Sequence, residues 1–358
     1  MSASRERLAV IFGGRSPEHE VSVVSARSVM READAARFEV VPFGISKGGR
    51  WLSPLETRAR LEAEARDLGP DAARGVLDTP EVLGELAVVD AVFPIVHGPL
   101  GEDGTLQGLL ELAGLPYVGA GVTASAIGMD KELMRAVFAE AGLPQAAYLA
   151  LRDADVEAPP ADRVREIEQR LGFPCFVKPA NGGSSVGVTR ARSREDLGDA
   201  IREAGRFDRK VVIEEAITGR EVECAVLGNE EPQASPLGEI TPRAEFYTYE
   251  AKYADSSTEL TVPARVSDAV RERIQELAVR AFEALDCAGM ARVDFFVTPS
   301  DDVRVIEVNT LPGFTPISMY PRLWQEAGLS YSGLISRLVD LGIERHRTVE
   351  RRGEAARG

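Results

Sequence analysis

The alternation of strand-like and helix-like segments near the start of the chain most restricts the folds open to it. Apolar runs typical of buried strands cover residues 8–14, 38–45 and 88–98, and apolar residues at helical spacing follow the first and third of them. Strands that alternate with helices in this way form a parallel sheet. We therefore predict a parallel α/β unit over residues 1–122.

The pattern changes after Pro144. Later strands alternate apolar with polar residues, and residues 290–297 and 303–309 are predicted to form a hairpin across the short turn TPSDD. We predict two further lobes, over residues 123–217 and 218–346, so the fold class combines α/β with α+β.

Two segments are predicted to lack regular structure. Residues 145–170, which hold two prolines and several acids, are expected to be a surface connection. The charged tail, residues 344–358, is expected to be frayed.

Charge and apolar content argue against several partners. The formal net charge of −15 disfavours a sequence-independent grip on nucleic acid or on an anionic membrane. No apolar run reaches the roughly 18 residues of a membrane span, and the opening residues are expected to form a first strand rather than a signal peptide. Cys175, Cys224 and Cys287 stand singly among apolar residues and are predicted to be buried free thiols in a reducing compartment.

Lysine is scarce in this chain. Five of its 42 basic residues are lysines: Lys47, Lys131, Lys178, Lys210 and Lys252. A chain that prefers arginine keeps lysine where a compact ammonium charge is needed. Three of the five fall inside the motifs described below, whereas Lys47 and Lys210 are expected at the surface.

The hairpin carries the strongest chemical signal. On regular strands Arg292 and Asp294 share one face, as do Glu307 and Asn309. Two carboxylates and an amide oxygen on adjacent strands are the hard ligands that Mg²⁺ prefers.

A solvated polar face of an antiparallel sheet is the alternative for this hairpin. On a regular strand Val303 and Val305 would lie on the same face as Glu307, so the pattern alone does not decide. The run VNTLPGFTP that follows favours a site, because its Pro-Gly turn brings backbone N–H groups close to the carboxylates and to Arg292. A plain strand-ending turn stays open.

The loop KPANGGSSVG, residues 178–187, can bind phosphate. Its glycines let backbone amides approach an anion without a Cβ in the way. Its lysine precedes the glycines, whereas a Walker A loop has the lysine after them. A glycine-rich turn remains the other interpretation.

The next strand, within residues 211–217, carries two acids. Glu214 and Glu215 lie where extended backbone can contact an adenine edge, and Glu221 follows after a turn, where it can meet a ribose hydroxyl. Surface acids on one more strand are the alternative.

These motifs occur in a known order. The chain resembles the D-alanine–D-alanine ligase family of the ATP-grasp fold in the segments VHGPLGEDGTLQGLLELAGLPYVG, MDK, VKPANGGSSVG, EFYTYEAKY, ARVDFF and EVNTLPGFTPIS. The resemblance runs from about Ala9 to Asp340. It implies a preATP-grasp domain followed by a two-lobed ATP-grasp fold, with a phosphate flap in the central lobe and a metal site and covering loop in the last.

The resemblance also implies the reaction and its partners. Two D-alanines would be joined at the expense of ATP through a D-alanyl phosphate, for peptidoglycan synthesis. Two Mg²⁺ ions, or Mn²⁺ in their place, would be bound by Asp294, Glu307 and Asn309, with Glu307 bridging. The family further implies a cytoplasmic homodimer.

Matching positions imply the nucleotide contacts. Lys131 and Lys178 would hold phosphates, Glu214 and Ile217 would meet adenine, and Glu221 would meet the ribose. The full implied set is Lys131, Lys178, Ser184, Ser185, Glu214, Glu215, Ile217, Glu221 and Lys252.

Matching positions imply the amino-acid contacts as well. Glu18 would bind the ammonium of the first D-alanine, with Ser184 and Tyr253 hydrogen-bonded to it, and His97 would lie near that substrate's carboxylate. Arg292 and the Gly313 N–H would stabilise the oxyanion. The second D-alanine would be held by Ser318 and the Met319 N–H. From the residues alone, a helix-start acid is the preferred interpretation of Glu18, and a strand-end histidine is that of His97.

Acceptor choice is less determined. Tyr253 in the covering loop favours D-alanine, because relatives that use D-lactate tend to have phenylalanine there. Met319 stands where relatives often have leucine, and Pro316 and Ile317 where others are more polar. A ligase with D-lactate or D-serine as acceptor is the alternative.

Overall fold

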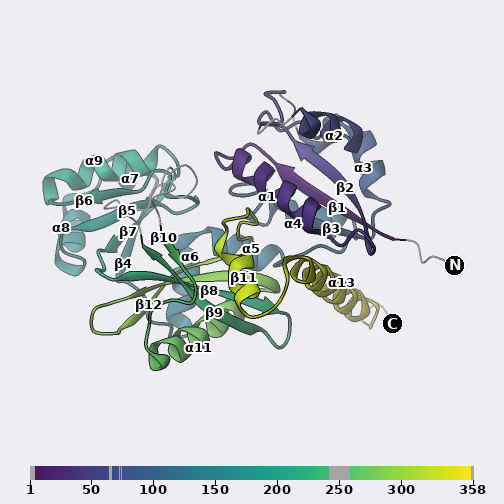
Figure 1. The fold of residues 1–358 in the computed structure, drawn as a ribbon. Helices are drawn as coiled ribbons and strands as arrows, with labels where there is room; N and C mark the ends of the chain where they lie inside the picture. Colours follow the sequence, from purple (N-terminus) through teal and green to yellow (C-terminus); the bar gives the residue numbers. More distant parts are fainter. Residues whose placement is uncertain (1–4, 64–66, 72, 74, 242–258, 356–358) are drawn as a thin grey trace.

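The computed structural model describes residues 5–63, 67–71, 73, 75–241 and 259–355. They form three sheets, each covered by its own helices (Figure 1). None of the helices in this part of the chain contains an apolar stretch long enough to cross a bilayer.

The first sheet is parallel, as predicted. Its strands run in the order β2-β1-β3, and both outer strands pair with β1 in parallel register. The elements of this unit are β1 (Glu6–Gly13), α1 (His19–Glu32), β2 (Phe38–Ile45), α2 (Pro54–Glu62), η1 (Val76–Asp78), α3 (Pro80–Leu86), β3 (Ala91–Pro94) and α4 (Thr105–Leu112). Buried apolar strands in the parallel arrangement explain why the segments have almost no alternation.

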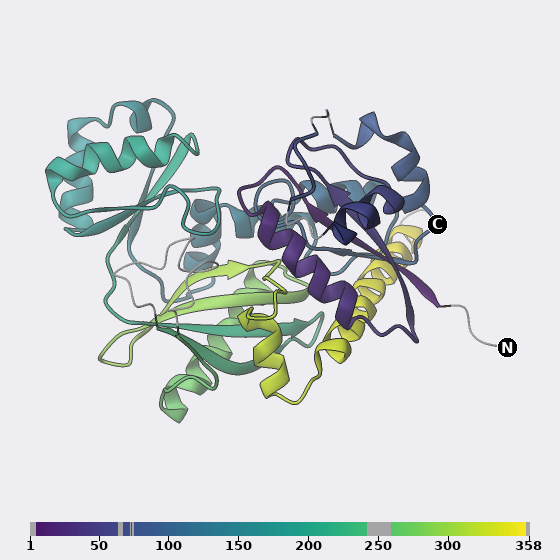
Figure 2. The ribbon, with the colours of Figure 1, turned by 45° about the horizontal axis from the view of Figure 1, so that its top comes forward.

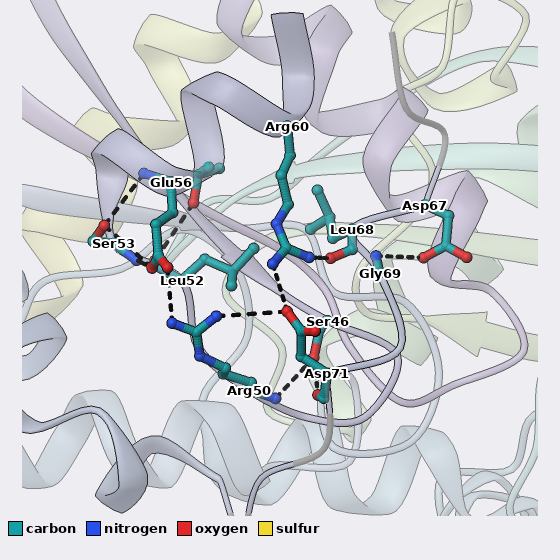
Figure 3. A network of polar contacts seen from close by, with 11 residues as sticks. Ser46, Arg50, Leu52, Ser53, Glu56, Arg60, Asp67, Leu68, Gly69 and Asp71 are labelled. Carbon is teal, nitrogen blue, oxygen red and sulfur yellow. Dashed lines mark hydrogen bonds and ion pairs between the residues drawn. The ribbon is translucent and has the colours of Figure 1, made fainter. Parts of the chain in front are cut away.

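A polar network connects α2 with the segments before and after it (Figure 3). Arg50 and Arg60 both donate to Asp71 Oδ2, and Arg60 also donates to the backbone oxygen of Leu68. The Leu68 N–H in turn donates to His19 Nε2 at 3.1 Å. The network therefore holds the start of α1, the helix that follows the first strand, in place.

The central sheet is antiparallel, in the order β4-β7-β5-β6. Its elements are β4 (Tyr148–Arg152), α7 (Ala154–Glu157), α8 (Ala161–Arg170), β5 (Cys175–Pro179), β6 (Thr189–Ala191), α9 (Arg194–Gly205) and β7 (Lys210–Glu215). The prediction that residues 145–170 form a surface connection is wrong, because β4, α7 and α8 lie there. The signal was weak because α8 buries little more than Ile167.

The third sheet is also antiparallel, in the order β10-β9-β8-β11-β12. The remaining elements are α5 (Val122–Met129), α6 (Lys131–Glu140), β8 (Arg220–Gly228), β9 (Gln233–Thr241), β10 (Glu259–Thr261), α11 (Asp268–Ala284), β11 (Gly289–Val297), β12 (Val303–Asn309), α12 (Met319–Glu326) and α13 (Tyr331–Ala355). Met134 and Phe138 of α6 pack into the core beneath this sheet, with α11. The division of the chain into three separate domains stays a prediction.

A bulge in the hairpin resolves the ambiguity of its faces. Asp294 pairs with Glu307, but Phe295 pairs with Val305, so Ile306 is the extra residue. The bulge turns Val305 into the apolar core while Glu307 keeps the face of Asp294. The expectation that Val305 and Glu307 share a face, which assumed a regular strand, is therefore wrong.

The last helix, α13, packs against the N-terminal unit. Both views place α13 beside the first unit (Figures 1 and 2). Arg37 pairs with Asp340 at 2.6 Å, and Arg345 donates to Glu111 and lies over the Tyr117 ring. The prediction of a frayed tail is wrong over residues 344–355, since α13 continues to Ala355.

Candidate active site

A pocket lies where the three sheets meet, and most of the predicted amino-acid and metal residues line it. Strand ends and loops of all three units contribute to its wall. The predicted residues on the wall are Glu18, His97, Lys131, Ser184, Arg292, Glu307, Asn309, Gly313, Ser318 and Met319.

Glu18 and the glycine-serine loop meet across this pocket. Ser184 donates its hydroxyl hydrogen to Glu18 Oε1, although the two residues come from different units. The Glu18 N–H donates to Ser16 Oγ at 3.0 Å, which orients the start of α1. Ser184 and Ser185 have φ angles of 48° and 60°, a left-handed conformation that is uncommon for serine and occurs where surrounding structure enforces it.

His19, the neighbour of Glu18, is a structural residue. Its Nδ1 lies 2.7 Å from Gly14 O, and its Nε2 accepts from the Leu68 N–H, so the neutral ring with hydrogen on Nδ1 satisfies both contacts. Burial lowers the pKa of His19, against the backbone bond to Gly14. With His19 uncharged, the charges at the start of α1 are those of Glu18 and Glu20, and Glu18 is the one on the pocket wall.

His97 belongs to a chain of hydrogen bonds between two units. Its Nδ1 lies 3.4 Å from Glu102 Oε1, a carboxylate that can only accept, so Nδ1 carries the hydrogen. The Ser25 hydroxyl then donates to His97 Nε2 (3.1 Å) and accepts from the Phe314 N–H (3.3 Å). The chain therefore connects His97 with the loop that holds Gly313.

Arg292 is buried among carboxylates. It donates from Nε and Nη2 to both oxygens of Asp294, at 2.8 Å each, and its Nε lies 3.2 Å from Glu223 Oε1. Burial alone would lower the pKa of Arg292, but Asp294 and Glu223 raise it well above its usual value. Glu223 was missed from the sequence, although it follows Glu221 at the two-residue period of one strand face.

The donor set beside Arg292 fits a divalent cation. Asp294 and Glu307 are paired across β11 and β12, and Asn309 lies opposite Arg292 on the same face. Glu221, Glu223 and Asp294 also bring carboxylate oxygens within 4.8 Å of one another. These are hard oxygen ligands, which suit Mg²⁺ or Mn²⁺.

Lys131 bridges the metal face and the glycine-serine loop. Its ammonium donates to Gly182 O at 2.7 Å and lies 3.9 Å from Glu307. Burial lowers the pKa of Lys131, with Glu307 acting in the opposite direction. Asp130, just before it, caps α6 by accepting from two backbone N–H groups.

Lys210 corrects a prediction about the lysines. It is 6% exposed and pairs with Asp130 and Glu132, so it is not a surface residue. By holding the cap residue of α6, Lys210 helps to fix the place from which Lys131 projects.

Ser318 organises the loop that enters α12. Its Oγ accepts from the Thr315 N–H at 2.9 Å, and a Cβ on Gly313 would come within 2.9 Å of the same oxygen. Only glycine therefore fits at position 313 without a shift. The Met319 side chain is buried against Gly238, where a Cβ would meet its sulfur at 2.4 Å, so its backbone N–H rather than its side chain is available to a ligand.

Comparisons with known proteins identify the family of the chain. Family models described as D-ala D-ala ligase N-terminus and D-ala D-ala ligase C-terminus match residues 7–120 and 137–340. The D-alanine--D-alanine ligase of Geobacillus thermodenitrificans is 47% identical over 353 residues, which cover 96% of each chain. The chain belongs to the D-alanine–D-alanine ligase family.

Solved structures support the same assignment. The D-alanine-D-alanine ligase from Coxiella burnetii has a TM-score of 0.82 and 35% identity, over 99% of this chain and 100% of that one. The VanG D-Ala:D-Ser ligase from Enterococcus faecalis has a TM-score of 0.79 and 36% identity, over 95% and 100% of the two chains. The ATP-grasp fold of this ligase family is thereby confirmed for the chain.

The residues predicted for the adenosine half lie apart from the pocket wall. Glu214 is paired with Lys178 and Arg135 instead, and Glu215 accepts from the Ala147 N–H. Further predicted residues outside the described wall are Lys178, Ser185, Ile217, Glu221 and the predicted metal ligand Asp294. Lys252 and Tyr253 fall outside the described residues, so their roles stay predictions.

Ser25 is a residue that sequence reasoning missed, and it yields a test. Replacing Ser25 by alanine removes the link between His97 and Phe314 and leaves a buried N–H without its acceptor, which costs about 1–3 kcal/mol of stability. We expect a rise in KM for D-alanine of roughly tenfold, the factor that corresponds to 1.4 kcal/mol, with KM for ATP little changed. Steady-state kinetics with each substrate varied would measure this.

Ser28 supplies the matched control. It lies on the same helix and is equally buried, but its hydroxyl donates only to Val24 O of its own helix. Ser28→Ala should keep both KM values, and an equal effect of the two substitutions would contradict the proposed role of Ser25.

Proposed function

We propose that this protein forms D-alanyl-D-alanine from two D-alanines, with ATP converted to ADP and phosphate. The observation that carries the proposal is the convergence in one pocket of Glu18, just before α1, Arg292 of β11 and Glu307 of β12. The family, to which the chain belongs over nearly its whole length, supports the same reaction.

The charged residues of the site would determine how the first D-alanine is oriented. Glu18 would hold its ammonium, which leaves its carboxylate directed at the metal face and the loop that Lys131 contacts. A carboxylate oxygen attacks the terminal phosphorus of ATP, and ADP leaves. Lys131 and Lys178 would offset the phosphate charge, since positioning and neutralisation are most of what such a transfer needs.

The second D-alanine completes the reaction. Ser318 and the Met319 N–H would hold its carboxylate, and its amine attacks the acyl carbon of D-alanyl phosphate. Negative charge that develops on the acyl oxygen would be stabilised by Arg292 and the Gly313 N–H. Phosphate then leaves, and the amine loses a proton as the peptide bond forms.

Divalent ions would complete the phosphate site. Asp294, Glu307 and Asn309 would hold two Mg²⁺, or Mn²⁺, with Glu307 shared between them. When bound, such ions offset charge on the transferring phosphoryl group. A cytoplasmic homodimer stays a prediction from the family.

A phosphate-release assay across acceptors tests the reaction. With Mg·ATP and D-alanine alone, we expect steady phosphate release and a dipeptide detectable by mass spectrometry. Parallel reactions add D-lactate or D-serine as a second substrate. No release with D-alanine, together with a mixed product from D-lactate or D-serine, would overturn the choice of acceptor in favour of the alternative ligase.

A further inference from the structure

Arg135 is the largest fully buried side chain of the described residues, yet it carries a charge that the predicted site does not use. It lies on α6, one helical turn after Lys131, and is 2% exposed. Its Nε donates to Glu214 Oε1 at 2.9 Å, and its Nη2 donates to the same oxygen. A buried guanidinium needs such a partner, since an unpaired one is very costly to desolvate.

Glu214 is shared between two cations in an unequal way. Arg135 contacts Oε1, whereas the Lys178 ammonium donates to Oε2 at 2.7 Å. The Lys178 side chain is 18% exposed and that of Arg135 is 2% exposed. Lys178 can therefore turn outward to the loop that follows it, while Arg135 cannot.

Gln145 fixes Arg135 in this position. The Gln145 amide donates to Arg135 O at 2.8 Å, and its oxygen lies 3.4 Å from Arg135 Nη1. The Tyr148 ring lies 5.7 Å from the guanidinium carbon. Contacts from the loop at Gln145 and from strands β4 and β7 thus hold the guanidinium whether or not Lys178 stays.

The pKa of Glu214 agrees with its being shared between Arg135 and Lys178. Burial by itself would raise the pKa of Glu214, but Lys178 and Arg135 lower it to about 2. The carboxylate is therefore ionised at neutral pH, and it must keep at least one cation when it is buried.

We propose that Arg135 is a positioning residue for nucleotide binding: it is the permanent counter-ion of Glu214 and thereby frees Lys178 to move to the phosphates of ATP. The inference rests on the proposed function only in taking ATP as the ligand. Without Arg135, Lys178 would be the last partner of a buried carboxylate, and ATP would have to compete with Glu214 for it. Arg135 then acts through Lys178 without touching the nucleotide.

A double-substitution cycle tests this with nucleotide binding as the readout. Affinity for a non-hydrolysable Mg·ATP analogue would be measured by calorimetry on the full chain without D-alanine. Arg135→Met should weaken binding at least tenfold. Adding Glu214→Gln removes the carboxylate that retains Lys178, so Arg135→Met/Glu214→Gln should bind within about threefold of Glu214→Gln alone.

Several outcomes separate this from a merely structural role. If Arg135 only ties α6 to β7, the double variant should bind as weakly as Arg135→Met, and the proposal is overturned; it is also overturned if Arg135→Met binds like wild type. Arg135→Lys keeps the charge and should recover most of the affinity. If Arg135→Met does not fold, the affinity of the double variant is compared with that of Arg135→Lys instead. Arg170→Met, on an exposed pair of α8, should change nothing.

The same measurements keep two failures apart. Analogue binding does not need turnover, so an inactive enzyme that shows the Arg135 cycle would refute the proposed reaction and keep the positioning role. An active enzyme in which the cycle is absent would refute only the role of Arg135.

Discussion

Arg292→Met is expected to lower kcat by about a thousandfold, at the upper end of what removing one oxyanion donor costs. The physical reason is that Arg292 lines the described pocket together with Gly313, and in the proposed reaction it offsets the charge that develops on the acyl oxygen. The substitution also leaves Asp294 and Glu223 buried without their shared cation, which should lower the free energy of unfolding by about 3–5 kcal/mol. Phosphate-release kinetics and chemical denaturation would measure the two effects.

Two further variants separate catalysis from stability. Arg292→Lys keeps a positive charge near Asp294 but cannot form the two parallel bonds of a guanidinium, so it should recover stability more than kcat. Arg273→Met removes an arginine that is 46% exposed and pairs with Glu276 on α11; it should change neither. An Arg292→Met enzyme with wild-type kcat would contradict the oxyanion role.

Glu307→Gln is expected to raise the Mg²⁺ concentration needed for half-maximal activity at least tenfold and to lower kcat at least a hundredfold. Glu307 faces Asp294 across the hairpin and lies 3.9 Å from Lys131, so the amide keeps the shape and removes one charge from the donor set. Loss of metal-borne charge stabilisation is worth several kcal/mol. Titrations of activity with Mg²⁺ and with Mn²⁺ would measure the shift.

Stability supplies the control for this variant. The Glu307 side chain is 34% exposed, and substitutions at such positions usually change stability by less than about 0.5 kcal/mol. Glu307→Gln should therefore unfold like wild type without ligand, yet gain less thermal stability from Mg·ADP. Glu326→Gln, an exposed acid at the end of α12, should keep both. Unchanged Mg²⁺ dependence in Glu307→Gln would remove it from the metal site.

Much of the site was predictable because its signals are local. Glycines before two serines, and charged or amide side chains two residues apart on each strand of the hairpin, can be recognised within short stretches of the sequence. The order of the motifs then indicated the family, and the structure gathers Glu18, Ser184 and Arg292 around one pocket.

The faces of the hairpin were not predictable in the same way. A regular strand places Val305 beside Glu307, and only the pairing of β12 with β11 shows that Ile306 is the extra residue. A bulge depends on the register between two strands, which one strand's pattern does not contain.

The sequence by itself determined the family, the parallel first unit and ten of the 22 residues that line the pocket, because these depend on short motifs and periodic patterns. Only the tertiary structure decided that Arg135 and Lys210 are buried and that the charged tail is a helix. Their partners, Glu214 and Asp130, lie 79 and 80 residues away along the chain. Charged residues are buried only where a counter-charge meets them, and that meeting is a property of the folded chain.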